Sequence, residues 1–169
     1  AINTRYLGEA ALETNDLPAL RLSIKFFNTF IRIALNTQKV RSAYNVLHQY
    51  RQLAEKLIAF EQPEILSDVA EHMRYYAQTA LHLHLGFVTE TLAYDLAALC
   101  ELAAHKHSPA HDAMLGCLLS IDQAPENEAQ ELTLRGVRKA QIKLATAYLD
   151  MHNELAAHRR TDGPPGGFW

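Results

Sequence analysis

Apolar side chains recur every three or four residues through nearly the whole chain, and the strict alternation typical of a β-strand is scarce. Residues three and four apart share one face of an α-helix, so this pattern predicts an all-α fold. Short polar stretches between the periodic segments predict turns and therefore antiparallel neighbours, in a helical bundle or an irregular α-α superhelix. We expect six or seven helices, over residues 2–13, 15–36, 38–60, 64–86, 86–107, 109–122 and 126–158.

Turn-forming residues place the boundaries of these segments. Asn15 or Asp16 can cap the second helix, with Pro18 in its first turn. The stretch 64–107 exceeds the usual length of a helix. We therefore expect a break at Gly86, with this glycine in the left-handed conformation that commonly ends a helix.

Two apolar stripes run along the second predicted helix. One consists of Leu20, Ile24, Phe27, Ile31 and Ala34, and the other of Leu22, Phe26, Phe30 and Ile33. A helix that is apolar on two faces needs neighbours on both. The pattern predicts that this helix is buried on most of its circumference and forms the spine of the fold.

Similar words recur in the sequence at intervals of about fifty residues. The segment "AYDLAALCELAAH" at 93–105 resembles "AYLDMHNELAAH" at 147–158, and "AYNVLHQYRQLAEKL" at 43–57 begins in the same way. Such recurrence favours pairs of helices stacked as in tetratricopeptide-type arrays, although no fixed period of about 34 residues holds. Composition alone also produces short repeated words in a chain rich in Ala and Leu.

The composition fits one globular domain. The chain has 169 residues, of which 49% are hydrophobic and 21% charged, enough to bury a core without a disulfide framework. Two cysteines and no secretory leader favour a reducing cytoplasm. Residues 1–160 are expected to form a single helical domain, and residues 161–169, rich in Gly and Pro, an irregular tail.

The charge is unevenly distributed along the chain. Residues 1–60 carry eight Lys or Arg against four Asp or Glu, and the rest carries eight against fifteen. Arg21, Lys25 and Arg32 share one helical stripe that could contact phosphate or an anionic membrane surface. The alternative is an ordinary solvated helix face. The stripe lacks the density and the interleaved aromatic residues of a nucleic-acid surface, so we expect no nucleic-acid partner.

One turn concentrates the residues that could ligate a metal. Glu101 and His105 lie four residues apart on one helical face, and His107, His111 and Asp112 follow across the turn. Zinc or iron would accept such side chains, and Cys117 could stand opposite Cys100. The alternative is a set of surface residues, with His favoured near a helix C-terminus by the helix dipole. Since the chain has no CxxC spacing, no cofactor is the primary expectation.

A second catalytic hypothesis is a metal-dependent phosphohydrolase of the His-Asp type. His111 and Asp112 would supply the central pair, with His82 or His84 before it and Asp150 after it. A chain with nine histidines offers many such combinations. There is no Gly-rich phosphate loop, no GxSxG motif and no cysteine with an activating partner, so we do not expect an enzyme.

Several stretches resemble the soluble part of a family of uncharacterised bacterial predicted membrane proteins. They are "RYLGEAALE", "NDLPALRL", "RSAYNVLHQYR", "FVTETLAYDLAALCE" and "LRGVRKAQIKLATAYL", and the resemblance covers most of residues 1–158. It implies a cytoplasmic helical domain that follows transmembrane helices outside this chain, with the basic first sixty residues nearest the anionic surface. The family supplies no catalytic residues.

No segment of the chain itself is expected to span a bilayer. The stretch 75–89 is free of Asp, Glu, Lys and Arg, but it is only fifteen residues long and contains two His. The sequence therefore favours a non-catalytic interaction or regulatory domain that binds a protein partner or itself, with possible membrane proximity. The alternative is a metal-binding or metal-dependent hydrolase domain.

Overall fold

The chain folds entirely into α-helices and turns where its structure is described. The computed structural model describes residues 1–121 and 125–161, with side chains as far as residue 157, and contains no strand in these ranges. This confirms the predicted all-α class, while 162–169 of the predicted tail lie outside the described residues. The helices are α1 (Ile2–Glu13), α2 (Leu17–Asn36), α3 (Val40–Ala59), α4 (Pro63–His82), α5 (Gly86–His105), α6 (His111–Leu119) and α7 (Glu128–Thr161).

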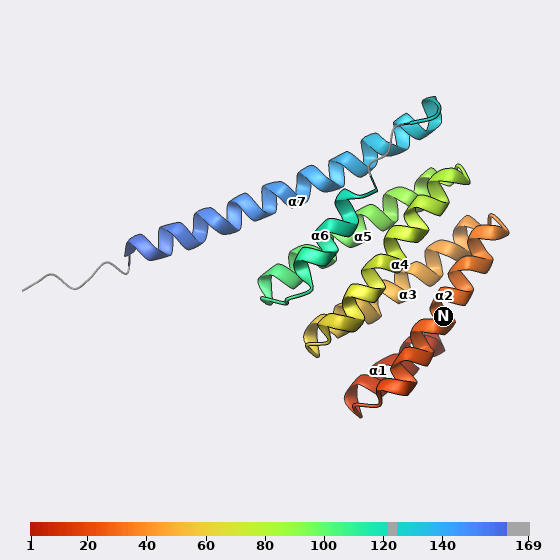
Figure 1. Cartoon of the computed structure of the whole chain (residues 1–169), viewed down its shortest axis with the longest axis horizontal. Coiled ribbons are helices and arrows are strands. Elements are labelled where there is room, and N and C mark those ends of the chain that lie inside the picture. The colour runs from red at the N-terminus through yellow and green to blue at the C-terminus, as the bar shows by residue number, and fades with distance from the viewer. Residues whose placement is uncertain (122–124, 162–169) are drawn as a thin grey trace, which may run out of the picture.

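The helices are stacked in two layers (Figure 1). From α1 to α6 each helix packs against the next one along the chain, and from α1 to α7 each also packs against the next but one. The odd-numbered helices therefore form one layer and α2, α4 and α6 the other. Contacts restricted to near neighbours in the chain are typical of stacked helical arrays. α7 extends well beyond the other helices at one side of the stack.

Five turns of the same construction join the first six helices. Each turn has one residue in the left-handed conformation, with φ between 51° and 57°. The amide of the next residue donates to a carbonyl five residues back, and the amide of the left-handed residue donates to a carbonyl three residues back. This is the Schellman motif, which satisfies the last carbonyls of a helix. The left-handed residues are Asn15, Gln38, Glu61, His84 and His107.

These turns reveal a repeat of 23 residues, because each left-handed residue follows the previous one by that number. Side chains at the same spacing have the same environment: Phe27, Tyr50, Met73 and Leu96 are each no more than 1% exposed. A pair of helices thus repeats after 46 residues, within the range of about 34 to 47 residues known for helix-pair repeats. The similar words noted in the sequence do not follow this repeat, because their first residues occupy different positions in their helices. Ala43 is the fourth residue of α3, whereas Ala93 is the eighth of α5.

The predicted break at Gly86 is displaced by two residues. His84 adopts the left-handed conformation, with φ 57°, and no described glycine has positive φ. Gly86 instead begins α5, where a Cβ would lie 2.5 Å from Thr133 Oγ1 of α7. The glycine is required for the close approach of these two helices. At α2 the prediction was correct, because Asp16 is the N-cap and its Oδ1 accepts from the Ala19 amide at 3.0 Å.

The prediction that the second helix is the spine was wrong. Its first stripe is buried, with Phe27 and Ile31 fully covered, but the second stripe is exposed to solvent. α2 contacts α1 and α3 of the other layer and α4 of its own, and none of the described helices covers its second stripe (Figure 1). α5 has the central position, with contacts to α3, α4, α6 and α7.

None of the described helices combines the length and the apolar character needed to cross a membrane.

Candidate interaction surface

Four large apolar side chains of α2 project into solvent. Their exposed fractions are 46% for Leu22, 42% for Phe26, 40% for Phe30 and 56% for Ile33. Spacings of four, four and three residues place them on one continuous face of the helix. We call these four residues the open face of α2. Contiguous exposed apolar side chains of this kind mark interaction sites more often than isolated ones do.

The 23-residue repeat shows what normally covers this face. Two repeats later the equivalent residues in α4 are Asp68, His72, Tyr76 and Thr79. Tyr76 Oη donates to the Asn28 carbonyl of α2 at 3.5 Å, and His72 Nδ1 lies 3.3 Å from Asn28 Nδ2. α4 therefore uses these positions to contact the preceding helix of its own layer.

The odd-numbered layer uses the equivalent positions in the same way. In α5, the buried Asp95 accepts from Arg51 Nη1 of α3 at 2.8 Å. In α3, Leu53 packs so closely on α1 that a Cβ at Gly8 would lie 2.9 Å from its Cδ1. In the described part of the chain this face has no helix against it on α2 or on α1, the first helix of the other layer, where the equivalent Leu7 is 40% exposed.

Burial raises the pKa of Asp95 even though Arg51 stabilises the carboxylate. The pair links α3 and α5, with Asp95 buried and Arg51 partly exposed. His72 is half-buried, and burial lowers the pKa of its imidazole. It is therefore neutral at pH 7 and suits a hydrogen bond to Asn28 better than a charged role.

A hollow opens at the end of the open face. Phe30 and Ile33 line a space of about 320 Å³ together with residues of the first turns of α3, among them Val46. α1 begins at Ile2 and has 12 residues, whereas α2 to α5 have 20 each. Ala1 also lines this hollow.

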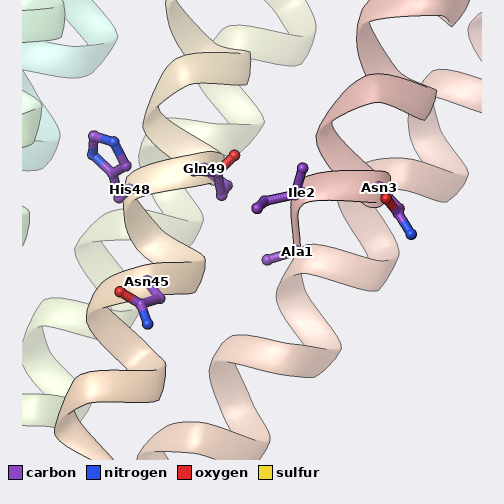
Figure 2. A pocket seen from close by; sticks show the side chains of 6 residues that line it. All are labelled: Ala1, Ile2, Asn3, Asn45, His48 and Gln49. Carbon is purple, nitrogen blue, oxygen red and sulfur yellow. The ribbon is translucent and has the colours of Figure 1, made fainter.

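A second hollow, of about 550 Å³, flanks the start of α1 on the side of α3 (Figure 2). Ile2 of α1 and Gln49 of α3 extend toward each other across it, and the buried Gln49 Oε1 has no hydrogen-bond partner. Asn3 points away from the gap, and His48 lies on the far side of α3. The polar groups do not converge on one point, as catalytic groups must.

The predicted basic stripe lies on the side of α2 that faces α4. Arg21 and Lys25 line a hollow of about 230 Å³ with Asn28, His72 and Asp68, while Arg32 lies further along the helix. Asp68 places a negative charge in this hollow. None of the three cations forms an ion pair with a described residue. Contact with an anionic surface stays a prediction.

The predicted metal ligands do not come together as a set, although His107 and His111 line one hollow of about 500 Å³ with His152 of α7. His105, His107 and Asp112 are exposed, and the nearest approach among the candidates is between neighbours in sequence, His111 Nε2 and Asp112 Oδ1 at 3.0 Å. Across the described residues no group of three or more His, Cys, Asp or Glu is placed to hold a metal ion. Glu101 is half-buried on α5. The side chain of His158, in the second "ELAAH", lies outside the described residues.

The residues of the phosphohydrolase hypothesis are also separated by the fold. His82 ends α4, where its Nδ1 lies 2.7 Å from the Gln78 carbonyl, and His84 forms the turn that follows. Asp150 is exposed on α7. His111 and Asp112 are the first two residues of α6. The histidines and Asp112 thus lie at helix ends and turns, and Asp150 lies inside a helix.

The two cysteines do not stand opposite each other as predicted. Cys100 Sγ lies 2.9 Å from Tyr148 Oη of α7, and Cys117 donates to Glu71 of α4 at 3.4 Å. Burial raises the pKa of both thiols, that of Cys117 to about 12 with a further contribution from Glu71. Both are protonated at neutral pH, and a protonated thiol is a poor nucleophile.

Sequence reasoning found the residues of the open face but misjudged their environment. Their spacing and apolar character were visible, whereas the absence of a covering helix depends on the order of the stack. The period of 23 residues was present in the spacing of the turns and of the apolar positions. It was missed because equivalent positions hold different residue types.

No family model, no curated protein and no solved structure matches this chain.

Proposed function

We propose that this chain is a non-catalytic helical interaction domain that binds a segment of another protein. The observation that carries the proposal is the open face of α2, where Leu22, Phe26, Phe30 and Ile33 expose apolar surface at positions that contact a helix elsewhere in the stack. Apolar surface exposed to water costs free energy, and a bound partner would remove that cost.

The ionisable side chains of the interior support a structural rather than a catalytic role. Asp95 pairs with Arg51, His72 faces Asn28, and the two buried thiols are protonated. Each of these groups joins two helices of the stack. His72 also lines the hollow of about 230 Å³ that it shares with Asp68, Arg21 and Lys25.

The sequence resemblance and the charge distribution suggest where such a domain would work. A place on the cytoplasmic side of a bacterial membrane would bring the basic first sixty residues toward anionic lipid headgroups. Arg21, Lys25 and Arg32 are the candidates for that contact. Partner binding at the open face does not depend on this location.

Photo-crosslinking in cells tests the proposal directly. Benzoylphenylalanine replaces Phe26 in the full-length protein, and in a matched control it replaces Ile142, which is 65% exposed on α7. We expect a crosslinked protein adduct at position 26 that position 142 does not produce. Equal adducts at both positions, or no adduct at position 26, would contradict a binding role for the open face.

A further inference from the structure

Two successive hollows lie along the edge of the stack that holds the turns after α3 and α5. The first has a volume of about 310 Å³ and is lined by residues of both turns. The second, of about 500 Å³, lies between the turn after α5 and the second half of α7. Ile58 and Glu61 of the first are related by 46 residues to Ala104 and His107 of the second. The two hollows thus occupy equivalent places in successive pairs of helices.

The second hollow departs from the first in size and in chemistry. Ala104 stands where the first hollow has the larger Ile58. α6 begins four residues after the left-handed His107, whereas α2 to α5 each begin two residues after their left-handed residue. The smaller side chain and the longer connection both add space. Three histidines of different elements line this space: His107 of the turn, His111 of α6 and His152 of α7.

The charge around the second hollow suits a cation. Apart from the histidines, its described lining residues are uncharged: Ala104, Ser108, Pro109, Tyr148, Met151 and Leu155. Two carboxylates lie nearby, because burial and Cys100 raise the pKa of Tyr148 and the charges of Asp112 and Glu101 add to the rise. A neutral imidazole also offers a nitrogen lone pair. The surroundings therefore favour a positively charged ligand that is bound through nitrogen.

We propose that His107, His111 and His152 bind a zinc ion in this hollow. Neutral imidazole is a common zinc ligand, and three histidines with a water molecule form a known tetrahedral set. The proposal does not depend on the binding role of the open face of α2.

His111 is the ligand that the surrounding structure holds in place. Its Nε2 lies 3.0 Å from Asp112 Oδ1, and its ring meets the Tyr148 ring edge-on with centroids 6.2 Å apart. A carboxylate on one nitrogen commonly orients a ligating histidine, which leaves Nδ1 available for the metal. The three rings do not converge on one point in the described conformation, so His107 and His152 must rotate to complete the site. Both are exposed, and exposed side chains change rotamer readily.

A zinc ion at this place would join α7 to α6 and to the turn after α5. The described side chains of α7 beyond Leu144 are half-buried or exposed. The ion would therefore hold the part of α7 that has the least packing. A ligand that binds only the folded arrangement stabilises it.

Isothermal titration of zinc chloride into the whole chain, without an affinity tag, tests the proposal. We expect one equivalent to bind with a dissociation constant of about 10 µM or less. His107→Ala and His152→Ala should each weaken binding by about tenfold or more. Asp112→Ala should weaken it by about tenfold, the usual effect of losing a carboxylate behind a ligand. The control His105→Ala removes an exposed histidine outside the hollow and should leave the affinity unchanged.

Hydrogen exchange locates the bound ion. Zinc should slow the exchange of amides in residues 146–157 of the unmodified chain, because the ion restrains the second half of α7, and should not do so in His152→Ala. Absence of binding would overturn the proposal, as would an unchanged affinity in His107→Ala and His152→Ala. Equal weakening by His105→Ala, or binding that leaves exchange in α7 unchanged, would assign the ion to scattered surface histidines and would also overturn it.

Discussion

Single residues that occupy the left-handed region set the spacing of the whole stack. Gln38, Glu61 and His84 have φ between 51° and 57°. A left-handed residue with a Cβ costs about 1–2 kcal/mol, and glycine avoids most of this cost. The chain nevertheless uses polar residues at all five such turns. Five short helix connections therefore carry a strain that packing of the helices offsets.

Replacing such a residue with glycine should stabilise the protein. For Gln38→Gly and Glu61→Gly we expect the free energy of unfolding in urea to rise by about 0.5–1 kcal/mol each, since relief of the strain exceeds the added entropy of the unfolded chain. Lys143→Gly, at an exposed position inside α7, should lower it by about 0.5–1 kcal/mol. A loss of stability in all three variants would show that the turns are not strained.

At the scale of one element, α2 shows how similar patterns lead to different environments. Phe26 and Phe27 are neighbours in sequence, yet Phe27 is fully buried against Tyr50, with ring centroids 5.1 Å apart, and Phe26 is 42% exposed. The helix pattern predicts two apolar faces equally well. Which face is covered depends on the position of α2 in the stack.

The two phenylalanines should therefore differ in their effect on stability. Phe27→Ala should lower the free energy of unfolding by about 3–5 kcal/mol, because a cavity opens between α2 and α3, and Ile31→Ala by about 2–5 kcal/mol. Phe26→Ala should change it by less than about 1 kcal/mol. Chemical denaturation of the three variants decides the matter, and a large loss for Phe26→Ala would mean that the open face is covered in solution.

At the scale of the whole molecule, α5 has the most neighbouring helices, and packing decreases toward α7. α5 contacts helices of both layers, whereas α7 packs chiefly on α5. Within α7, Val137, Ala140 and Leu144 are buried, and after Leu144 no described side chain reaches that degree of burial. The second half of α7 lacks a covering layer.

Hydrogen exchange should reproduce this gradient. Amides of α5 should exchange most slowly, since they open only with the unfolding of several helices, and amides of residues 146–157 should exchange faster than those of 130–144 in the same helix. Mass spectrometry of peptic peptides resolves these segments. Uniform protection along α7 would indicate that the overhanging half is covered by an association not visible in a single chain.

The sequence alone determined the properties that arise from local physical chemistry. Apolar periodicity specified helices and excluded strands, and a capping Asp16 with Pro18 began α2 where expected. The buried stripe through Phe27 and Ile31 was correct for the same reason, because residues at helical spacing share a face whatever surrounds them.

Tertiary structure decided which faces are covered and which side chains meet. The open face of α2 and the partly buried pair of Arg51 and Asp95 both follow from which helices lie side by side, and such contacts join residues of different helices. His105, His107 and Asp112 lie close in sequence, yet the turn leaves all three in solvent. Periodicity describes one helix at a time, whereas burial depends on the neighbouring helix, so the candidate site could be read only from the stack.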